Sequence, residues 1–142
     1  MELKRLQIEY FRNFEKIEIE LKNHNVIFGM NDVGKTNLMY ALRFLLDREV
    51  RNNGFTTTDF FRNDISKTIK ITLEISLMDY EESMETKNIV SKVGGARNSK
   101  NLDTFFFQIQ GSYDNNEYFG IPKIFWGSGL DELIELPQKV YF

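Results

Sequence analysis

Residues 29–36 read GMNDVGKT, which places two glycines, a lysine and a threonine at the spacing of the phosphate-binding P-loop. Gly29 and Gly34 allow main-chain conformations and close approaches that a Cβ would prevent. Asn31 and Asp32 tolerate a left-handed backbone better than most residues. The successive amides of such a loop can surround an anion at the positive end of the helix that follows. The motif therefore predicts a site for nucleotide phosphates.

Two side chains of the motif carry the remaining chemistry. The ammonium group of Lys35 can neutralise the β- and γ-phosphates, and the hydroxyl of Thr36 can coordinate Mg²⁺. We therefore predict ATP and Mg²⁺ as ligands, with Thr36 as the metal ligand and no catalytic residue within the chain. The predicted nucleotide-binding residues are Gly29, Asn31, Asp32, Val33, Gly34, Lys35 and Thr36. The alternative is a glycine-rich turn that merely precedes a helix.

Such a loop must be held between a buried strand and a helix. Residues 26–28 (VIF) form a continuous apolar run, typical of a strand buried on both faces. Residues 35–46 are apolar around most of a helical circumference, which predicts a helix inside the protein. Alternating apolar residues before the loop predict strands at 6–10 and 17–21, joined by a hairpin turn at 11–14.

The hairpin turn offers two further candidates for the site. Arg12 and Asn13 follow the first strand, and we predict that they lie against the ribose or phosphates of the nucleotide. The alternative is an ordinary polar turn with a solvated guanidinium group.

The remaining residues predict further strands and helices in an α/β fold. A mixed sheet would contain the P-loop strand, and antiparallel strands would form a side sheet. A polar surface loop is predicted at 47–67, followed by a strand at 69–77, a helix at 79–93 and a break at 94–99. Further strands are predicted at 104–110 and 118–126, with a turn at 111–117 between them. A short helix is predicted after 127–129, with Asp131 and Glu132 near its N-terminus.

Composition limits the other functions. The chain has 142 residues, a net charge of −3 and no cysteine, so we expect one domain in a reducing cytoplasm. No apolar run approaches the roughly 18 residues that a membrane-spanning helix needs.

Because the net charge is negative, contact with DNA would need a local patch of basic side chains. Arg43, Arg48, Arg51 and Arg62 could form such a DNA-binding strip. The alternative is that these arginines are solvated or paired with Asp47, Glu49, Asp59 and Asp64.

Two segments carry a family resemblance. MELKRLQIEYFRNFEKIEIEL and NVIFGMNDVGKTNLMYALRFLL resemble the N-terminal ABC-type ATPase lobe shared by RecF, SMC and OLD-family proteins. Within that group the chain is most similar to OLD-family endonucleases of the Gabija antiphage defence type. That similarity extends through residues 51–64, GGARNS and WGSGLDELIEL, so it covers nearly the whole chain.

The resemblance implies an ATP-regulated DNA endonuclease. Residues 1–142 would be the N-terminal part of its ATPase domain, and the Walker B motif, the signature motif and the Toprim nuclease domain would be absent. Asp79 is interpreted as a strand end and not as a Walker B acid. Gly94–Gly95 is interpreted as a loop and not as the signature motif. The resemblance also implies pairing of ATPase domains in a homo-oligomer, contact with DNA through the whole protein, and a helicase-like defence partner. This part alone should bind nucleotide without turnover. The alternatives are a RecF- or SMC-like DNA repair ATPase and a stand-alone nucleotide-binding or interaction protein.

Overall fold

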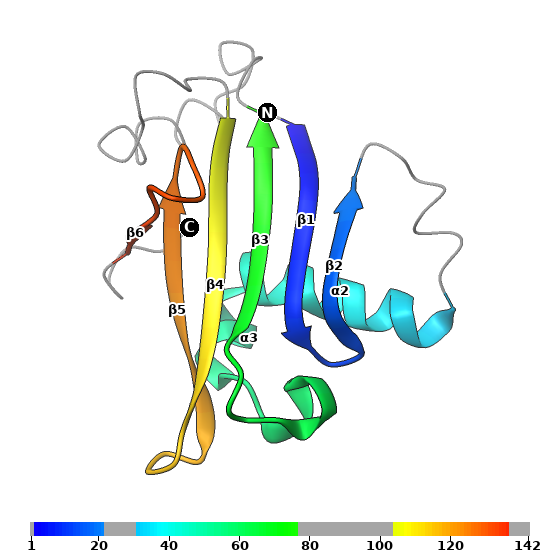
Figure 1. Cartoon of the computed structure of the whole chain (residues 1–142), viewed down its shortest axis with the longest axis vertical. Helices are drawn as coiled ribbons and strands as arrows, with labels where there is room; N and C mark the ends of the chain where they lie inside the picture. The colour runs from blue at the N-terminus through cyan, green and yellow to red at the C-terminus, as the bar shows by residue number, and fades with distance from the viewer. Residues whose placement is uncertain (1, 22–30, 77–103, 137–142) are drawn as a thin grey trace.

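A computed structural model describes residues 2–21, 31–76 and 104–136 (Figure 1). The predicted strand at 26–28, the predicted helix at 79–93 and the break at 94–99 lie outside these residues, as do Gly29 and Asp79. The described elements are β1 (Glu2–Phe11), β2 (Phe14–Glu20), α2 (Asp32–Leu46), α3 (Arg48–Asn53), the 3-10 turns η1 (Thr57–Asp59) and η2 (Phe61–Asn63), β3 (Ile69–Ser76), β4 (Thr104–Asp114), β5 (Phe119–Gly127) and β6 (Ile134–Glu135).

The strands form one six-stranded sheet in the order β2-β1-β3-β4-β5-β6, and every described pairing is antiparallel. The predicted antiparallel strands are confirmed. The predicted mixed sheet is not found in the described residues, where the antiparallel sheet is the main layer and not a side sheet. A mixed sheet requires a parallel pair reached by a crossover, and the strand expected to supply that pair, 26–28, is outside the described ranges.

The hairpin of β1 and β2 forms as its alternating sequence predicts. Leu6 pairs with Ile19 and Ile8 pairs with Ile17, so the apolar side chains of both strands share one face. The turn between the strands contains Arg12, whose φ of 53° is left-handed. The hairpin thus brings the predicted turn residues to one end of the sheet.

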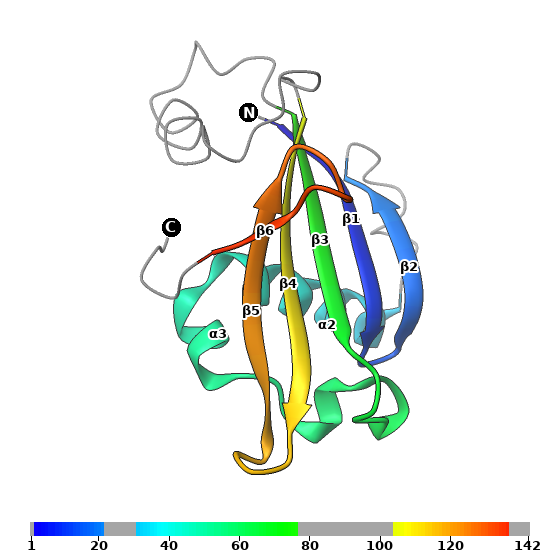
Figure 2. The same cartoon turned by 60° about the vertical axis from the view of Figure 1, so that its left-hand side comes forward.

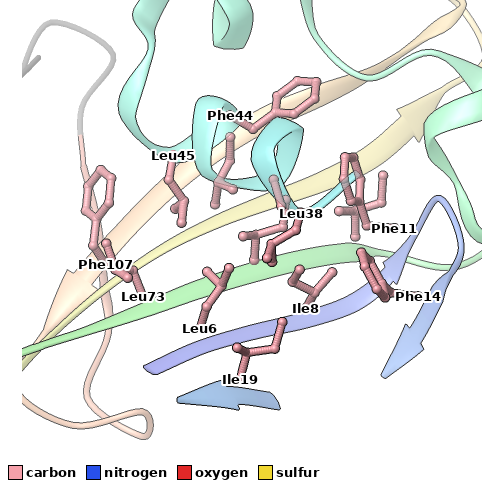
Figure 3. Packing of buried hydrophobic residues seen from close by; sticks show 14 of the residues in the cluster. Leu6, Ile8, Phe11, Phe14, Ile19, Leu38, Phe44, Leu45, Leu73 and Phe107 are labelled. Atoms are coloured by element: carbon pink, nitrogen blue, oxygen red, sulfur yellow. The ribbon is translucent and has the colours of Figure 1, made fainter. Parts of the chain in front are cut away.

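One helix covers the apolar face of this sheet (Figures 1 and 3). Leu38, Ala41 and Leu45 recur at helical spacing along α2 and are at most 1% exposed. They belong to the same buried cluster as Leu6 and Leu73 of the sheet. The prediction of a helix at 35–46 is confirmed, although α2 starts earlier, at Asp32. Its burial is one-sided, because the sheet covers one flank while Met39 and Leu46 are 56% and 59% exposed.

The prediction of a surface loop at 47–67 is wrong. This segment contains α3, η1 and η2, and it buries Phe55 and Phe60 at 0% and 1% exposure. The Phe55 ring stacks on Phe44 with centroids 4.2 Å apart. Its backbone pairs with Gly120 of β5 through N–O distances of 2.9 and 2.6 Å. Phe55 and Phe60 anchor the segment to the sheet. Because they show neither helical nor strand periodicity and lie among polar residues, the sequence does not indicate that they are buried.

Two other boundaries need correction. The predicted turn at 111–117 starts too early, because β4 continues to Asp114 and the turn follows it. Gly111 lies in the strand where a Cβ would come within 2.3 Å of the Phe55 ring, so close packing explains this glycine. The predicted short helix around Asp131 and Glu132 is wrong. That segment turns, with the Glu132 amide donating to the Gly129 carbonyl at 3.0 Å, and leads into β6.

The second face of the sheet is polar. A hollow of about 750 Å³ lies on it, lined by side chains that include Gln7, Thr72 and Gln108, and by Leu130 from the segment after β5. That segment doubles back over this face (Figure 2). The Gln108 amide donates to the Thr72 hydroxyl at 2.7 Å.

The outer strands of the described sheet differ in character from the inner ones. β2 exposes a run of charged side chains, and β6 has only two residues. The exposed charged residues of β2 are Glu15, Lys16, Glu18 and Glu20. No helix in the described ranges is long and apolar enough to cross a membrane.

Candidate nucleotide site

The second half of the P-loop motif forms the start of α2. Asn31 is the N-cap residue, and its Oδ1 accepts a hydrogen bond from the Gly34 amide at 2.7 Å. The Lys35 amide donates to the Asn31 carbonyl at 3.0 Å, which closes the first helical turn. The positive end of the helix dipole therefore coincides with residues 31–35, as an anion site requires. Gly29 is not among the described residues.

The residues at the start of α2 differ in exposure. Asp32, Val33 and Thr36 are exposed, Lys35 is half-buried and Gly34 is buried. An ammonium group and a hydroxyl therefore flank the helix N-terminus, where solutes can reach them. The described residues contain no group of three His, Asp or Glu side chains that could hold a metal ion.

Loss of the N-cap should be measurable as a loss of stability. Asn31→Ala removes the acceptor of the Gly34 amide, so we expect the free energy of unfolding to fall by about 1 kcal/mol. Urea denaturation followed by circular dichroism measures this change. Asn52→Ala, which removes an exposed amide side chain from α3, is the matched control and should have little effect. Equal losses in the two variants would contradict a capping role for Asn31.

The hairpin turn lies against the same helix. Nη1 of Arg12 donates to Oδ1 of Asn37 at 3.0 Å, and Nδ2 of Asn37 donates to Oδ1 of Asn13 at 2.8 Å. The guanidinium of Arg12 also lies 4.1 Å from the centre of the Tyr40 ring. The structure therefore brings both predicted turn residues to the helical turn that follows Thr36. Their contact with ribose or phosphates remains a prediction.

Sequence reasoning missed the partner that completes this arrangement. The Asp59 side chain is only 8% exposed, and its Oδ1 accepts from Nε of Arg12 at 3.0 Å. The sequence suggests Asp59 only as a partner for arginines nearby in the chain. The spacing of Thr56 and Asp59, a threonine with an acid three residues later, is the one local signal, because it is typical of a capped turn with a buried carboxylate.

Arg43, Arg51 and Arg62 do not form the DNA-binding strip that was weighed against solvated or paired arginines. Arg51 is 4% exposed and donates to the Leu45 carbonyl near the end of α2, so it is unavailable to DNA. Arg43 lies 3.7 Å from the Asp47 carboxylate, and Arg62 lies over the Phe61 ring at 5.1 Å. Helix capping, an ion pair and ring stacking account for these arginines.

A P-loop sequence whose second half begins a helix on a sheet, with Lys35 and Thr36 near the helix N-terminus, is typical of a P-loop nucleotide-binding protein. Residues 1–132 match the model of the AAA ATPase domain. The chain belongs to that family of ATPase domains.

Individual relatives agree with the predicted resemblance. The chain is 50% identical to the endonuclease GajA of Bacillus cereus over 98% of its own length, and it spans 24% of that protein. It is 43% identical over 63 residues to the DNA replication and repair protein RecF of Chlamydia abortus, covering 43% of the chain and 17% of that protein. A RecF of Streptococcus agalactiae is 26% identical over 72% of the chain and 29% of its own length. The resemblance to the Gabija nuclease and to RecF is thereby confirmed.

Proposed function

We propose that this chain is the ATP-binding part of an ATP-regulated DNA endonuclease of the OLD family that acts in antiphage defence. The observation that carries the proposal is the first turn of α2, where an N-terminal helix dipole, Lys35 and Thr36 coincide. Identity of 50% to the endonuclease GajA over 98% of the chain supports the specific class.

Each residue of the site has a distinct task in this proposal. The amides of the loop and Lys35 hold the phosphates, and Thr36 holds the Mg²⁺ that accompanies them. A phosphate oxygen that accepts from the Gly34 amide would replace Oδ1 of Asn31, which accepts from it in this structure at 2.7 Å. Arg12 and Asn13 face the ribose or phosphates from the side of the hairpin. Bound Mg²⁺ supplies charge neutralisation for the phosphates.

Other functions belong to the rest of such a protein. Because the chain spans 24% of the endonuclease GajA, we propose that residues 1–142 are the N-terminal part of the ATPase domain. The Walker B acids, the signature segment and a Toprim metal site that cuts DNA would then lie in other segments. Pairing of ATPase domains in a homo-oligomer, a helicase-like defence partner and a cytoplasmic location complete the proposal.

Equilibrium titration with ATP, in the presence and absence of Mg²⁺, tests the proposal. We expect the intact protein to bind ATP more tightly with Mg²⁺. Thr36→Ala should lose roughly tenfold in affinity when Mg²⁺ is present, since it removes one ligand to a charged partner. Thr57→Ala, an exposed threonine in η1, is the control and should behave like the wild type. Absence of ATP binding by the intact wild-type protein would overturn the proposal.

A RecF-like DNA repair ATPase is the second candidate. It is favoured by the RecF relatives, which include one that is 43% identical over 63 residues. Incubation of the intact protein with duplex DNA, ATP and Mg²⁺ distinguishes the two. Strand cleavage supports the endonuclease, whereas DNA binding without cleavage supports the repair ATPase.

A further inference from the structure

Asp59 lies outside the P-loop motif but is bound to Arg12, which contacts the turn of α2 just after that motif. Oδ1 of Asp59 accepts from Nε of Arg12 at 3.0 Å. Its Oδ2 accepts from the Thr56 amide at 2.9 Å and from the Thr56 hydroxyl at 3.2 Å. Both carboxylate oxygens are therefore occupied, and the η1 turn holds the carboxylate in one orientation.

The guanidinium of Arg12 is held on three sides. Asp59 binds Nε, Asn37 of α2 binds Nη1, and the Tyr40 ring lies under the guanidinium at 4.1 Å. In the described residues, Nη2 has no hydrogen-bond partner, and the Arg12 side chain is 24% exposed. The group is thus fixed against the P-loop helix with donor capacity left for an incoming oxygen.

The backbone at this junction is fixed as tightly as the side chains. The Arg12 amide donates to the Asp59 carbonyl at 2.8 Å, and Phe11 forms an isolated bridge with Phe60. Tyr10 and Arg12 have φ of 56° and 53°, left-handed conformations that cost about 1 kcal/mol or more for residues other than glycine. Strain of this kind persists where the surrounding contacts hold it, and it gathers at functional sites.

Stability alone is a weak reason for this ion pair. Removing both charges from water largely offsets their attraction, so a buried pair adds little net free energy. What the pair provides is geometry, because a bound carboxylate restricts a long side chain to one direction.

We infer that Asp59 is a positioning residue of the nucleotide site, which holds the Arg12 guanidinium ready for phosphate or ribose oxygens of a nucleoside triphosphate. This inference rests on the proposed function. It assigns to Asp59 a role in nucleotide affinity, although this residue follows the P-loop by some 20 residues of chain.

A double-mutant cycle on the intact protein tests the inference, with ATP·Mg²⁺ affinity measured by equilibrium titration. Asp59→Asn keeps an oxygen acceptor and removes the charge, and it should weaken binding roughly five- to tenfold. Arg12→Gln should weaken binding at least as much. The double variant should bind no more weakly than Arg12→Gln, because Asp59 acts through Arg12. Additive losses would overturn the inference.

Two controls separate positioning from folding. Asp64→Asn neutralises an exposed acid that follows η2, and Asp131→Asn neutralises an exposed acid elsewhere; both should keep wild-type affinity. A loss in Asp64→Asn equal to that in Asp59→Asn would overturn the inference, because it would not depend on the Arg12 contact. If Asp59→Asn does not fold, Asp59→Glu replaces it and should show a smaller loss that Arg12→Gln again masks.

The outcomes also separate this inference from the proposed function. Absence of ATP binding by the wild type sinks the proposed function. ATP binding by the wild type with unchanged affinity in Asp59→Asn sinks only the role of Asp59.

Discussion

Substitution of Lys35 by alanine is expected to weaken ATP binding by roughly a hundredfold. The ammonium group sits in the first turn of α2, where it would form charge-assisted hydrogen bonds to phosphate oxygens. Each such bond contributes about 1.5–3 kcal/mol, and two of them account for the expected loss. Lys35 forms no ion pair with any residue in the described ranges.

Equilibrium titration of the intact protein with ATP and Mg²⁺ measures this loss. Lys123→Ala removes an exposed lysine from β5 and serves as the matched control. Lys35→Arg should retain part of the affinity, because it preserves the charge but not the compact shape of the ammonium group. Equal affinities for the wild type and Lys35→Ala would refute the assignment of the loop.

The second large effect is on stability. Phe55→Ala is expected to lower the free energy of unfolding by about 3–5 kcal/mol. Phe55 is fully buried, stacks on Phe44 and meets Phe11 edge-on at 6.2 Å. Its ring fills the space where a Cβ on Gly111 would lie 2.3 Å away. Truncation would leave a cavity between two glycine-containing strands and the helix, which have little side-chain material to refill it.

Urea denaturation of the wild type and the variant measures this difference. Phe61→Ala, from the same segment but with a partly exposed ring, is the control and should cost much less. Similar losses for the two phenylalanines would show that Phe55 does not anchor the 54–60 segment to the sheet.

Local patterns were sufficient to predict most of the described sheet. The alternation in residues 6–10, 17–21 and 69–77 specifies strands whose two faces meet different surroundings, and the structure has strands there. The P-loop motif likewise predicts a helix N-terminus, and Asn31 caps one. These features depend on neighbours within a few residues, which a sequence displays directly.

The missed features all depend on contacts between distant parts of the chain. Asp59 meets Arg12 across 47 residues of sequence, and nothing near Asp59 identifies that partner. Gly111 was assigned to a turn because glycine is common in turns, but its lack of a side chain accommodates Phe55 from another segment. Phe55 and Phe60 are buried because they pair with Gly120 of β5 and Phe11 of β1. Their polar neighbours in the sequence give no indication of these distant partners.

The outer strands of the sheet bear on how the protein behaves at high concentration. Fibrils grow when an exposed strand accepts a strand from a second molecule. In the described part of the sheet, β2 would confront such a strand with the exposed charges of Glu15, Lys16, Glu18 and Glu20, and charged side chains on an outer strand oppose such pairing. At the opposite margin, β6 offers only two residues as a template. The two outermost described strands therefore offer a poor template for amyloid-like stacking.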